Sequence, residues 1–177
     1  MSIPAKHKKG APKNIPFAVV VVSDSRYEEL KSGKESSDRS TPIMVQLLTD
    51  AGHKVESIEC VPDSKAHILR VVEELLGIPV PAIITTGGTG LSPRDVTVES
   101  IEPLLEKKIP GFGELLRQIS FKEIGAATIL TRAIAGIIKE TVIFCLPGSP
   151  DAARLALEQL IIPEIGHIMK HLKEKRI

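Results

Sequence analysis

The sequence predicts an α/β sandwich around a mostly parallel sheet, and two observations predict it. Short apolar runs alternate along the chain with stretches that carry apolar residues at helical spacing. The first run, residues 17–22, is continuously apolar and rich in valine, as expected of a strand buried on both faces. With 177 residues, 42% of them hydrophobic, the chain can bury a core without disulfides or metal ions. We therefore expect one domain over residues 15–177, after a flexible basic tail over residues 1–14.

The expected elements follow in order along the chain. Strands are expected where short apolar runs end in turns, at 17–22, 53–61, 82–86, 133–139 and 140–146, the last two forming either a hairpin or two successive strands. Helices are expected where helical spacing or a capping signal begins a segment, at 38–51, 65–76, 97–105, 114–123 and from 151 onward. Pro163 should kink or divide the last helix, because proline cannot continue the hydrogen-bond ladder. The polar stretch 23–37 is expected to be a loop.

Composition excludes several classes of partner. The 23 Lys and Arg residues nearly balance 22 Asp and Glu residues, and aromatic residues make up only 3%, which argues against nucleic acid as the main partner. No apolar run approaches the roughly 20 residues that span a bilayer, so no membrane partner is expected. Cys60 and Cys145 lie far apart, and we expect two buried structural thiols. These features are typical of a cytoplasmic protein.

The stretch with the most chemical content follows the expected strand 82–86. It reads Thr85-Thr-Gly-Gly-Thr-Gly90 and is soon followed by Arg94 and Asp95. Glycines allow backbone N–H groups to converge on an anion, and Asp95 could hold a Mg²⁺ ion that neutralises phosphate oxygens. The spacing fits neither a P-loop nor the Gly-x-Gly-x-x-Gly dinucleotide motif. A purely structural turn is the alternative explanation.

Other polar residues follow other expected strands. Ser23 follows the first strand, Asp63 the second, and Gly148 and Ser149 the last. Each could simply be a turn or a helix cap. Because the carboxyl ends of parallel strands share one edge, however, Asp63 and Asp95 are expected to face the same cleft. Two carboxylates with Mg²⁺ suit phosphoryl or nucleotidyl transfer.

The histidines give no metal-site signal of their own. His167 and His171 stand four residues apart, but the Glu of the metalloprotease helix motif is missing. We expect no metal site at this pair.

Several motifs in a fixed order resemble the MoaB/Mog family of molybdenum cofactor biosynthesis proteins, over residues 15–172. They are Ser23-Asp24-Ser25-Arg26, Pro62-Asp63, Thr85-Thr-Gly-Gly-Thr-Gly90, Arg94-Asp95-Val-Thr97, Pro110-Gly-Phe-Gly-Glu114, Arg117-Gln-Ile-Ser120 and Leu146-Pro-Gly-Ser-Pro150. The threonine-glycine motif alone also occurs in related domains of MoeA-type and competence-damage-inducible proteins. The full ordered set in one short chain favours MoaB/Mog.

The resemblance implies a three-layer α/β/α sandwich that binds molybdopterin and adenylylates it with Mg²⁺-ATP, releasing pyrophosphate. It implies that Asp63 and Asp95 are the catalytic acids and handle the metal ion. It further implies that the phosphates are bound by Thr86, Gly87, Gly88, Thr89 and Gly90. The walls of the pterin and nucleotide cleft are expected to include Ser23, Ser120, Gly148 and Ser149.

The resemblance also implies a homotrimer or homohexamer and a downstream metal-insertion protein as a partner. Two other functions stay open from the sequence. One is a non-catalytic molybdopterin carrier or scaffold of the same pathway, and the other is a generic nucleotide-binding module.

Overall fold

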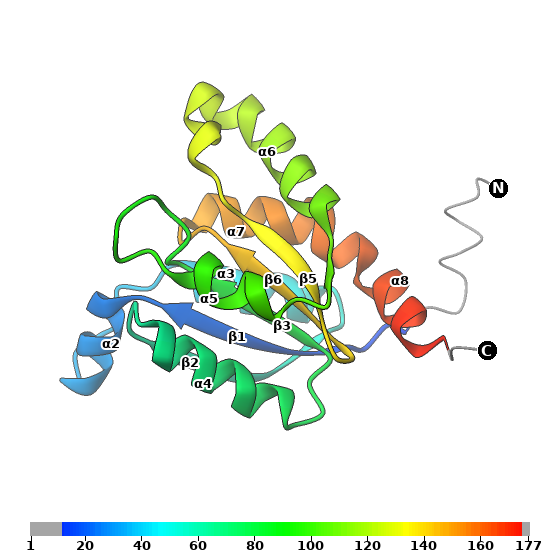
Figure 1. Cartoon of the computed structure of the whole chain (residues 1–177), viewed down its shortest axis with the longest axis horizontal. Helices are drawn as coiled ribbons and strands as arrows, with labels where there is room; N and C mark the ends of the chain where they lie inside the picture. The colour runs from blue at the N-terminus through cyan, green and yellow to red at the C-terminus, as the bar shows by residue number, and fades with distance from the viewer. Residues whose placement is uncertain (1–11, 175–177) are drawn as a thin grey trace.

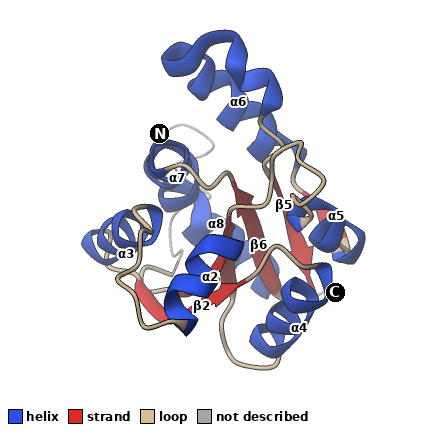
Figure 2. Ribbon diagram, turned by 90° about the vertical axis from the view of Figure 1, so that its left-hand side faces the viewer, coloured by secondary structure: helices blue, strands red, loops and turns tan. Residues whose placement is uncertain are grey.

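A six-stranded sheet lies at the centre of the molecule, and helices cover both of its faces (Figures 1 and 2). The computed structural model describes residues 12–174, so residues 1–11 of the expected tail lie outside the described residues. The strands follow the spatial order β2-β1-β3-β6-β5-β4. Their bounds are β1 (Pro16–Val22), β2 (Lys54–Val61), β3 (Ala82–Thr86), β4 (Lys107–Lys108), β5 (Ile134–Ile138) and β6 (Thr141–Leu146).

The sheet is mostly parallel. Strands β2, β1, β3 and β6 run in one direction, whereas β5 pairs antiparallel with β6 and β4 antiparallel with β5. The two apolar runs at 133–139 and 140–146 therefore form a hairpin, which is one of the two arrangements expected from the sequence. The predicted three-layer α/β/α sandwich with a mostly parallel sheet is confirmed.

The helices divide between the two faces of the sheet and its edges. Their bounds are α2 (Asp24–Lys31), α3 (Ser40–Asp50), α4 (Lys65–Leu76), α5 (Thr97–Ile101), α6 (Pro110–Ile124), α7 (Pro150–Ala156) and α8 (Ile162–Lys173). Two 3₁₀ segments, η1 (Glu102–Leu104) and η2 (Gly125–Leu130), and one π-helical segment, η3 (Leu157–Ile161), complete the description. Among the described residues, no helix combines the length and apolar character that a membrane span requires.

Side-chain alternation along β1 generates two separate cores. Phe17 and Val19 pack into the core formed with α3, α6, α7 and α8, whereas Ala18 and Val20 pack into the core formed with α4 and α5. All four side chains are fully buried. Burial of an aliphatic or aromatic side chain is worth roughly 1.5–3 kcal/mol, so both helical layers hold the parallel strands, and hence the strand ends, in place.

The order of the strands reverses beside β1. The chain leaves β1 for β2 on one side and returns for β3 on the other. In open α/β sheets the crevice at such a switch point, outside the carboxyl ends of the strands, is where ligands bind. The loops after β1, β2, β3 and β6 all leave the sheet at this edge, because these four strands are parallel.

The expectation of a loop over 23–37 is wrong for its first part. Residues 24–31 form helix α2, in which no residue is buried. A helix that buries nothing needs no apolar periodicity, so the sequence pattern could not reveal it. Ser23 supports its start by accepting a hydrogen bond from the N–H of Arg26 at 3.4 Å, and Asp24 lies in its first turn.

The second difference concerns the start of α6. The sequence predicted a helix from residue 114, but the helix begins at Pro110. Proline suits the first helical position, where its missing N–H would have no partner in any case. Phe112 then faces the core, with its ring 5.2 Å from that of Phe144. It does not face the cleft described below.

The predicted division of the last helix near Pro163 is confirmed. The π-helical segment η3 lies between α7 and α8 and ends two residues before this proline. The nitrogen of Pro163 cannot donate to the carbonyl four residues earlier, so the regular ladder is interrupted here.

Only one of the two cysteines is buried as expected. Cys145 is fully buried in β6, and burial raises the pKa of its thiol to about 12. Cys60 in β2 is partly exposed, because the outer face of this edge strand is only partly covered. Both are free thiols.

Candidate active site

A cleft of about 470 Å³ lies at the carboxyl ends of the parallel strands. We call it the strand-end cleft. All but one of the site residues expected from the sequence line it, namely Ser23, Asp63, Gly87, Gly88, Thr89, Gly90, Asp95, Ser120, Gly148 and Ser149. The other lining residues were not expected as site residues, although two of them stand in the quoted motifs; they are Val22, Arg26, Ile124, Leu130, Thr131, Pro147 and Ala152. Residues up to 130 positions apart thus meet at one edge of the sheet.

The glycine loop after β3 lies directly against the end of β1. Gly87 and Gly88 have φ angles of +99° and +62°, which side-chain-bearing residues rarely adopt. A Cβ atom on Gly87 would lie 2.2 Å from the carbonyl oxygen of Val22, and one on Gly88 would lie 2.3 Å from Oγ1 of Thr97. Only glycine fits at these two positions.

Buried Thr97 holds the glycine loop through two hydrogen bonds. Its hydroxyl donates to the carbonyl of Gly87 at 2.9 Å, and its N–H donates to the carbonyl of Gly88 at 2.9 Å. The N–H of Gly87 donates to the carbonyl of Leu146 at 3.1 Å, which ties the loop to the end of β6.

The loop's next three N–H groups form what we call the amide nest, residues 88–90. Within the part of the chain that the structure describes, no group accepts a hydrogen bond from the N–H of Gly88, Thr89 or Gly90. Successive unpaired N–H groups in a left-handed turn make a concave site for an anion. All three residues line the strand-end cleft.

Thr86 is the expected site residue that does not line the cleft. It is 2% exposed, and its hydroxyl donates to the carbonyl of Pro147 at 3.2 Å. A buried hydroxyl with a partner in the protein is not available to a ligand. Thr86 therefore holds the loop after β6 against the loop after β3, and its hydroxyl does not face the cleft.

Asp24 and Asp63 join the ends of β1 and β2 through reciprocal hydrogen bonds. The N–H of Asp24 donates to Oδ2 of Asp63 at 2.9 Å, and the N–H of Asp63 donates to Oδ1 of Asp24 at 3.0 Å. This pairing fixes the Asp63 carboxylate at the cleft. Asp24 was quoted only as part of a motif in the sequence, because an Asp after a strand equally signals a helix start.

The electrostatic surroundings raise the pKa of Asp63. Burial is the largest cause, and the charges of Asp24 and Asp95 act in the same direction. The hydrogen bond from the Asp24 N–H and the charge of Arg94 oppose the increase without cancelling it. Asp63 and Asp95 are therefore close enough to repel each other, and a bound cation would relieve that repulsion.

These carboxylates fit a magnesium ion of the kind that substrate phosphates share. Mg²⁺ prefers oxygen ligands and is usually held by one or two carboxylates together with water and phosphate, not by a full protein cage. Over residues 12–174 no group of three or more acidic, His or Cys side chains forms a complete metal site. Asp63 and Asp95 match a magnesium site in which the protein supplies two carboxylates and the substrate phosphates and water supply the other ligands.

Arg26 supplies positive charge to the same cleft. Its Nε is buried and has no hydrogen-bond partner among the described residues, and it lies 3.8 Å from Oδ1 of Asp38. Asp38 is itself engaged at the start of α3, where it accepts from the N–H of Ser40 at 2.9 Å. A buried guanidinium N–H without a partner is costly unless a ligand completes it, so Arg26 is a candidate anion ligand.

Arg132 is a functional residue that sequence reasoning missed. Its Nε donates to the carbonyl of Thr89 at 3.0 Å, its second terminal nitrogen contacts the carbonyl of Asp95 at 3.4 Å, and its guanidinium pairs with the Glu99 carboxylate. One side chain thus clamps both ends of the 89–95 loop to α5. The residue lies some forty positions from the loop, and no local pattern predicts such a contact.

The chain resembles proteins of one family over most of its length. Residues 18–167 match the family described as "Probable molybdopterin binding domain". The molybdenum cofactor biosynthesis protein B of Bacillus cereus is 47% identical over 167 residues, which cover 92% of this chain and 94% of that protein. The molybdopterin adenylyltransferase of Pyrococcus furiosus is 42% identical over 174 residues, 96% and 98% of the two chains.

A solved structure supports the same relationship. The crystal structure of a molybdenum cofactor biosynthesis protein B superposes with a TM-score of 0.85 at 44% identity, covering 93% of this chain and 99% of that one. The sequence-based recognition of the MoaB/Mog family is confirmed.

Replacing Arg132 should loosen the glycine loop without unfolding the protein. In Arg132→Gln we expect the hydrogen-bonded amides of this loop, those of Ser92, Arg94 and Asp95, to exchange hydrogen about tenfold faster or more, because hydrogen bonds to a charged group are worth about 1.5–3 kcal/mol. Hydrogen-exchange mass spectrometry measures this directly. Arg154→Gln, which removes only surface ion pairs with Glu123 and Glu158, is the matched control. Unchanged protection of the loop in Arg132→Gln would disprove the clamp.

Neutralising Asp63 should not destabilise the protein at neutral pH. The folded-state pKa of Asp63 is raised, so its contribution to stability is fully present below the unfolded pKa of about 3.9 and is lost as the pH rises through the folded value. We therefore expect Asp63→Asn to melt at the same or a higher temperature than the wild type at pH 7, with any advantage vanishing near pH 3.

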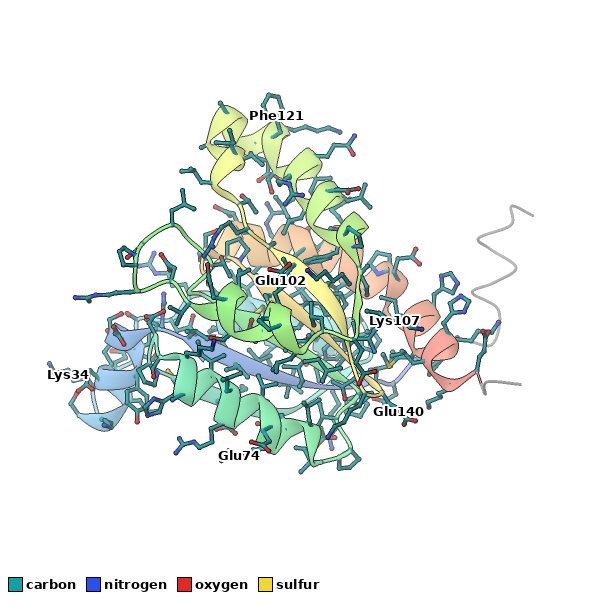
Figure 3. All side chains as sticks on the ribbon, viewed as in Figure 1. Lys34, Glu74, Glu102, Lys107, Phe121 and Glu140 are labelled. Carbon is teal, nitrogen blue, oxygen red and sulfur yellow. The ribbon has the colours of Figure 1, made fainter. Side chains whose placement is uncertain are left out.

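Thermal unfolding across this pH range checks the expectation. Glu140→Gln, an exposed change in the β5–β6 turn at the opposite end of the sheet, is the control (Figure 3). A variant that is clearly less stable at pH 7 would mean that the hydrogen bond from Asp24 outweighs the penalty of burying the charge.

Proposed function

The chain belongs to the family of molybdopterin-binding domains, and from this membership and its cleft we propose that it is a molybdopterin adenylyltransferase of molybdenum cofactor biosynthesis. One observation carries the proposal. An unpaired amide nest and two carboxylates share a single cleft at the switch point of the sheet. The amide nest and the acids together suit a reaction between two phosphates. In such a reaction the protein mainly positions the reactants and neutralises their charge, and forms no covalent bond itself.

The reaction joins two anionic substrates, molybdopterin and ATP. An oxygen of the pterin's terminal phosphate attacks the α-phosphorus of ATP and forms a new P–O bond. The bond from the α-phosphorus to the bridging oxygen breaks, and pyrophosphate leaves with that electron pair. The product is adenylylated molybdopterin, activated for metal insertion by a downstream partner.

The chain's own groups hold these phosphates in line. The amide nest donates hydrogen bonds to phosphate oxygens, and Arg26 adds a charged donor in the same cleft. Gly148 allows the loop after β6 to lie against Gly87, since a Cβ there would be 3.3 Å from the Gly87 Cα. Ser23, Ser120 and Ser149 offer hydroxyls along the walls to the pterin or the nucleotide.

Asp63 and Asp95 would hold the Mg²⁺ ion. When bound, Mg²⁺ neutralises phosphate charge that would otherwise oppose the approach of the second anion. The main chain fixes both acids for this role. Asp63 is held by the N–H of Asp24, and Asp95 accepts a hydrogen bond from the N–H of Ser92 at 2.9 Å.

Self-association into a homotrimer or homohexamer is part of the proposal. Helix α6 extends away from the sheet, and Phe121 lies near its outer end (Figure 3). Five large apolar side chains on α6 and η2 are 48–84% exposed, namely Leu115, Phe121, Ile124, Ile129 and Leu130. We call this surface the α6 face. Exposed apolar surface of this kind marks contacts between proteins, and a second copy of this chain is the occupant that an oligomer supplies.

The α6 face also borders the strand-end cleft. Ile124 and Leu130 line the cleft, so a copy docked on this face would lie beside the bound substrates. A hollow of about 540 Å³ between α6 and η2 lies in the same face, but it contains no amide nest and is mainly apolar. It suits a protein side chain better than a phosphate. We further propose a cytoplasmic location, which free Cys60 and Cys145 suit.

The activity assay tests the proposed function. Protein incubated with molybdopterin and Mg²⁺-ATP should release pyrophosphate and form adenylylated molybdopterin. Pterin binding without ATP consumption would favour a carrier or scaffold, and nucleotide binding without pterin binding would favour a generic nucleotide-binding module. Either result would overturn the proposal.

Asp95→Asn should separate activity from stability. We expect turnover to fall by about 100-fold or more, since removal of one group that stabilises transition-state charge typically has this effect. Asparagine can still accept the hydrogen bond from Ser92, so the melting temperature should change little. Glu140→Gln is again the control and should keep full turnover. Equal turnover in Asp95→Asn and the wild type would refute the role of Asp95.

A charge on the α6 face should break the oligomer. Ile129 is 84% exposed, so Ile129→Asp should fold normally but elute as a smaller species, because an interface cannot bury an unpaired carboxylate cheaply. Size-exclusion chromatography with light scattering measures the mass. Leu30→Asp, at a 65% exposed position on α2, is the control. A monomeric wild type, or an unchanged mass in Ile129→Asp, would contradict the assignment.

A further inference from the structure

Two histidines near the end of α8 face each other. The Nε2 atoms of His167 and His171 lie 2.9 Å apart, and their ring centroids lie 4.6 Å apart. This follows from their spacing, because residues four apart stack on one side of a helix. Their spacing alone gave no reason to expect a metal site, but the orientation of the rings adds information that spacing lacks.

Carboxylates fix both rings from their other sides. Nδ1 of His167 lies 3.2 Å from Oε2 of Glu164, and Nδ1 of His171 lies 3.2 Å from Oε2 of Glu174. An ionised carboxylate can only accept, so each Nδ1 carries the proton and donates it. The two Nε2 atoms then face each other at hydrogen-bond distance, so one of them donates a proton to the lone pair of the other.

A divalent cation that displaces this shared proton would be bound by both Nε2 atoms at once. The arrangement of a carboxylate, a histidine and a metal ion in line is the usual way in which proteins orient a metal-binding imidazole and raise its basicity. Here that arrangement occurs twice, on consecutive turns of one helix. We propose that His167 and His171 chelate a divalent first-row transition-metal ion through their Nε2 atoms.

The separation of the two nitrogens indicates which ions fit. With metal–nitrogen bonds of about 2.0–2.1 Å, a 2.9 Å separation corresponds to an angle of about 90° at the metal. Square-planar or tetragonal Cu²⁺ and Ni²⁺ use this angle, whereas tetrahedral Zn²⁺ would need the nitrogens about 3.3 Å apart. Cu²⁺ should therefore bind most tightly, with Ni²⁺ next and Zn²⁺ weaker than Cu²⁺.

The site is separate from the strand-end cleft. The C-terminal end of α8 lies toward the end of the sheet at which β1 begins, whereas the cleft lies where β1 ends (Figure 1). No third acidic, His or Cys ligand completes a metal-binding group in the described part of the chain, so water would fill the remaining positions. A metal here would tie the last two turns of α8 together and stabilise the folded chain.

Titration of the metal-free full chain with Cu²⁺ or Ni²⁺ tests the site. Calorimetry should give one ion per chain, a higher melting temperature with metal, and an electron paramagnetic resonance spectrum of the Cu²⁺ form with two imidazole nitrogens. His167→Gln and His171→Gln should each weaken binding about tenfold or more, and Glu174→Gln should weaken it by a similar factor while both rings remain.

The controls separate this pair from other histidines. His67→Gln alters a ring on α4 that contacts Ser64, so it should bind metal like the wild type. His171 is half-exposed, so His171→Gln should keep its circular dichroism spectrum. Equal metal affinity in the wild type and in both α8 variants, or binding that prefers Zn²⁺ over Cu²⁺, would overturn the proposal.

Discussion

The close approach of the β3 loop to the end of β1 is the constraint on which the site depends. The chain can pass so near the carbonyl of Val22 only because position 87 has no side chain and adopts a positive φ angle. This path turns the next N–H groups toward the cleft instead of toward protein acceptors. Thr97 donates to the carbonyls of Gly87 and Gly88, so the loop is held while its N–H donors stay available. An anion site thus results from backbone geometry alone.

The acids of the cleft oppose stability because they lie close together and one of them is partly buried. Asp63 is partly buried, and its pKa is raised by burial and by neighbouring carboxylates. Bringing like charges together at a strand end costs free energy in the unliganded protein, and a cation with phosphates would recover it on binding. The reciprocal hydrogen bonds between Asp24 and Asp63 offset part of that cost and fix the geometry.

Three surfaces of the molecule thus have different chemistry. The strand-end cleft presents amides, acids and one arginine, and the α6 face presents exposed apolar side chains. The histidine pair of α8 offers two oriented imidazole nitrogens at the other end of the sheet. The sheet lies between these surfaces, and both of its faces are buried under helices (Figure 2).

The sequence by itself determined the layers and the identity of the loop. Continuous apolar strands such as β1 and β3 and the spaced apolar residues of α4 need burial on defined faces, and this requirement is local enough to read from the chain. The division into a tail and one domain stays a prediction. Only the tertiary structure decided how Arg132 and Arg26 act, that Thr86 is buried, and that α2 exists. Arg132 meets its partners across some forty residues, Thr86 is covered by a loop from another strand, and α2 buries no side chain. Such contacts depend on which strands lie side by side, and no spacing along the chain encodes that.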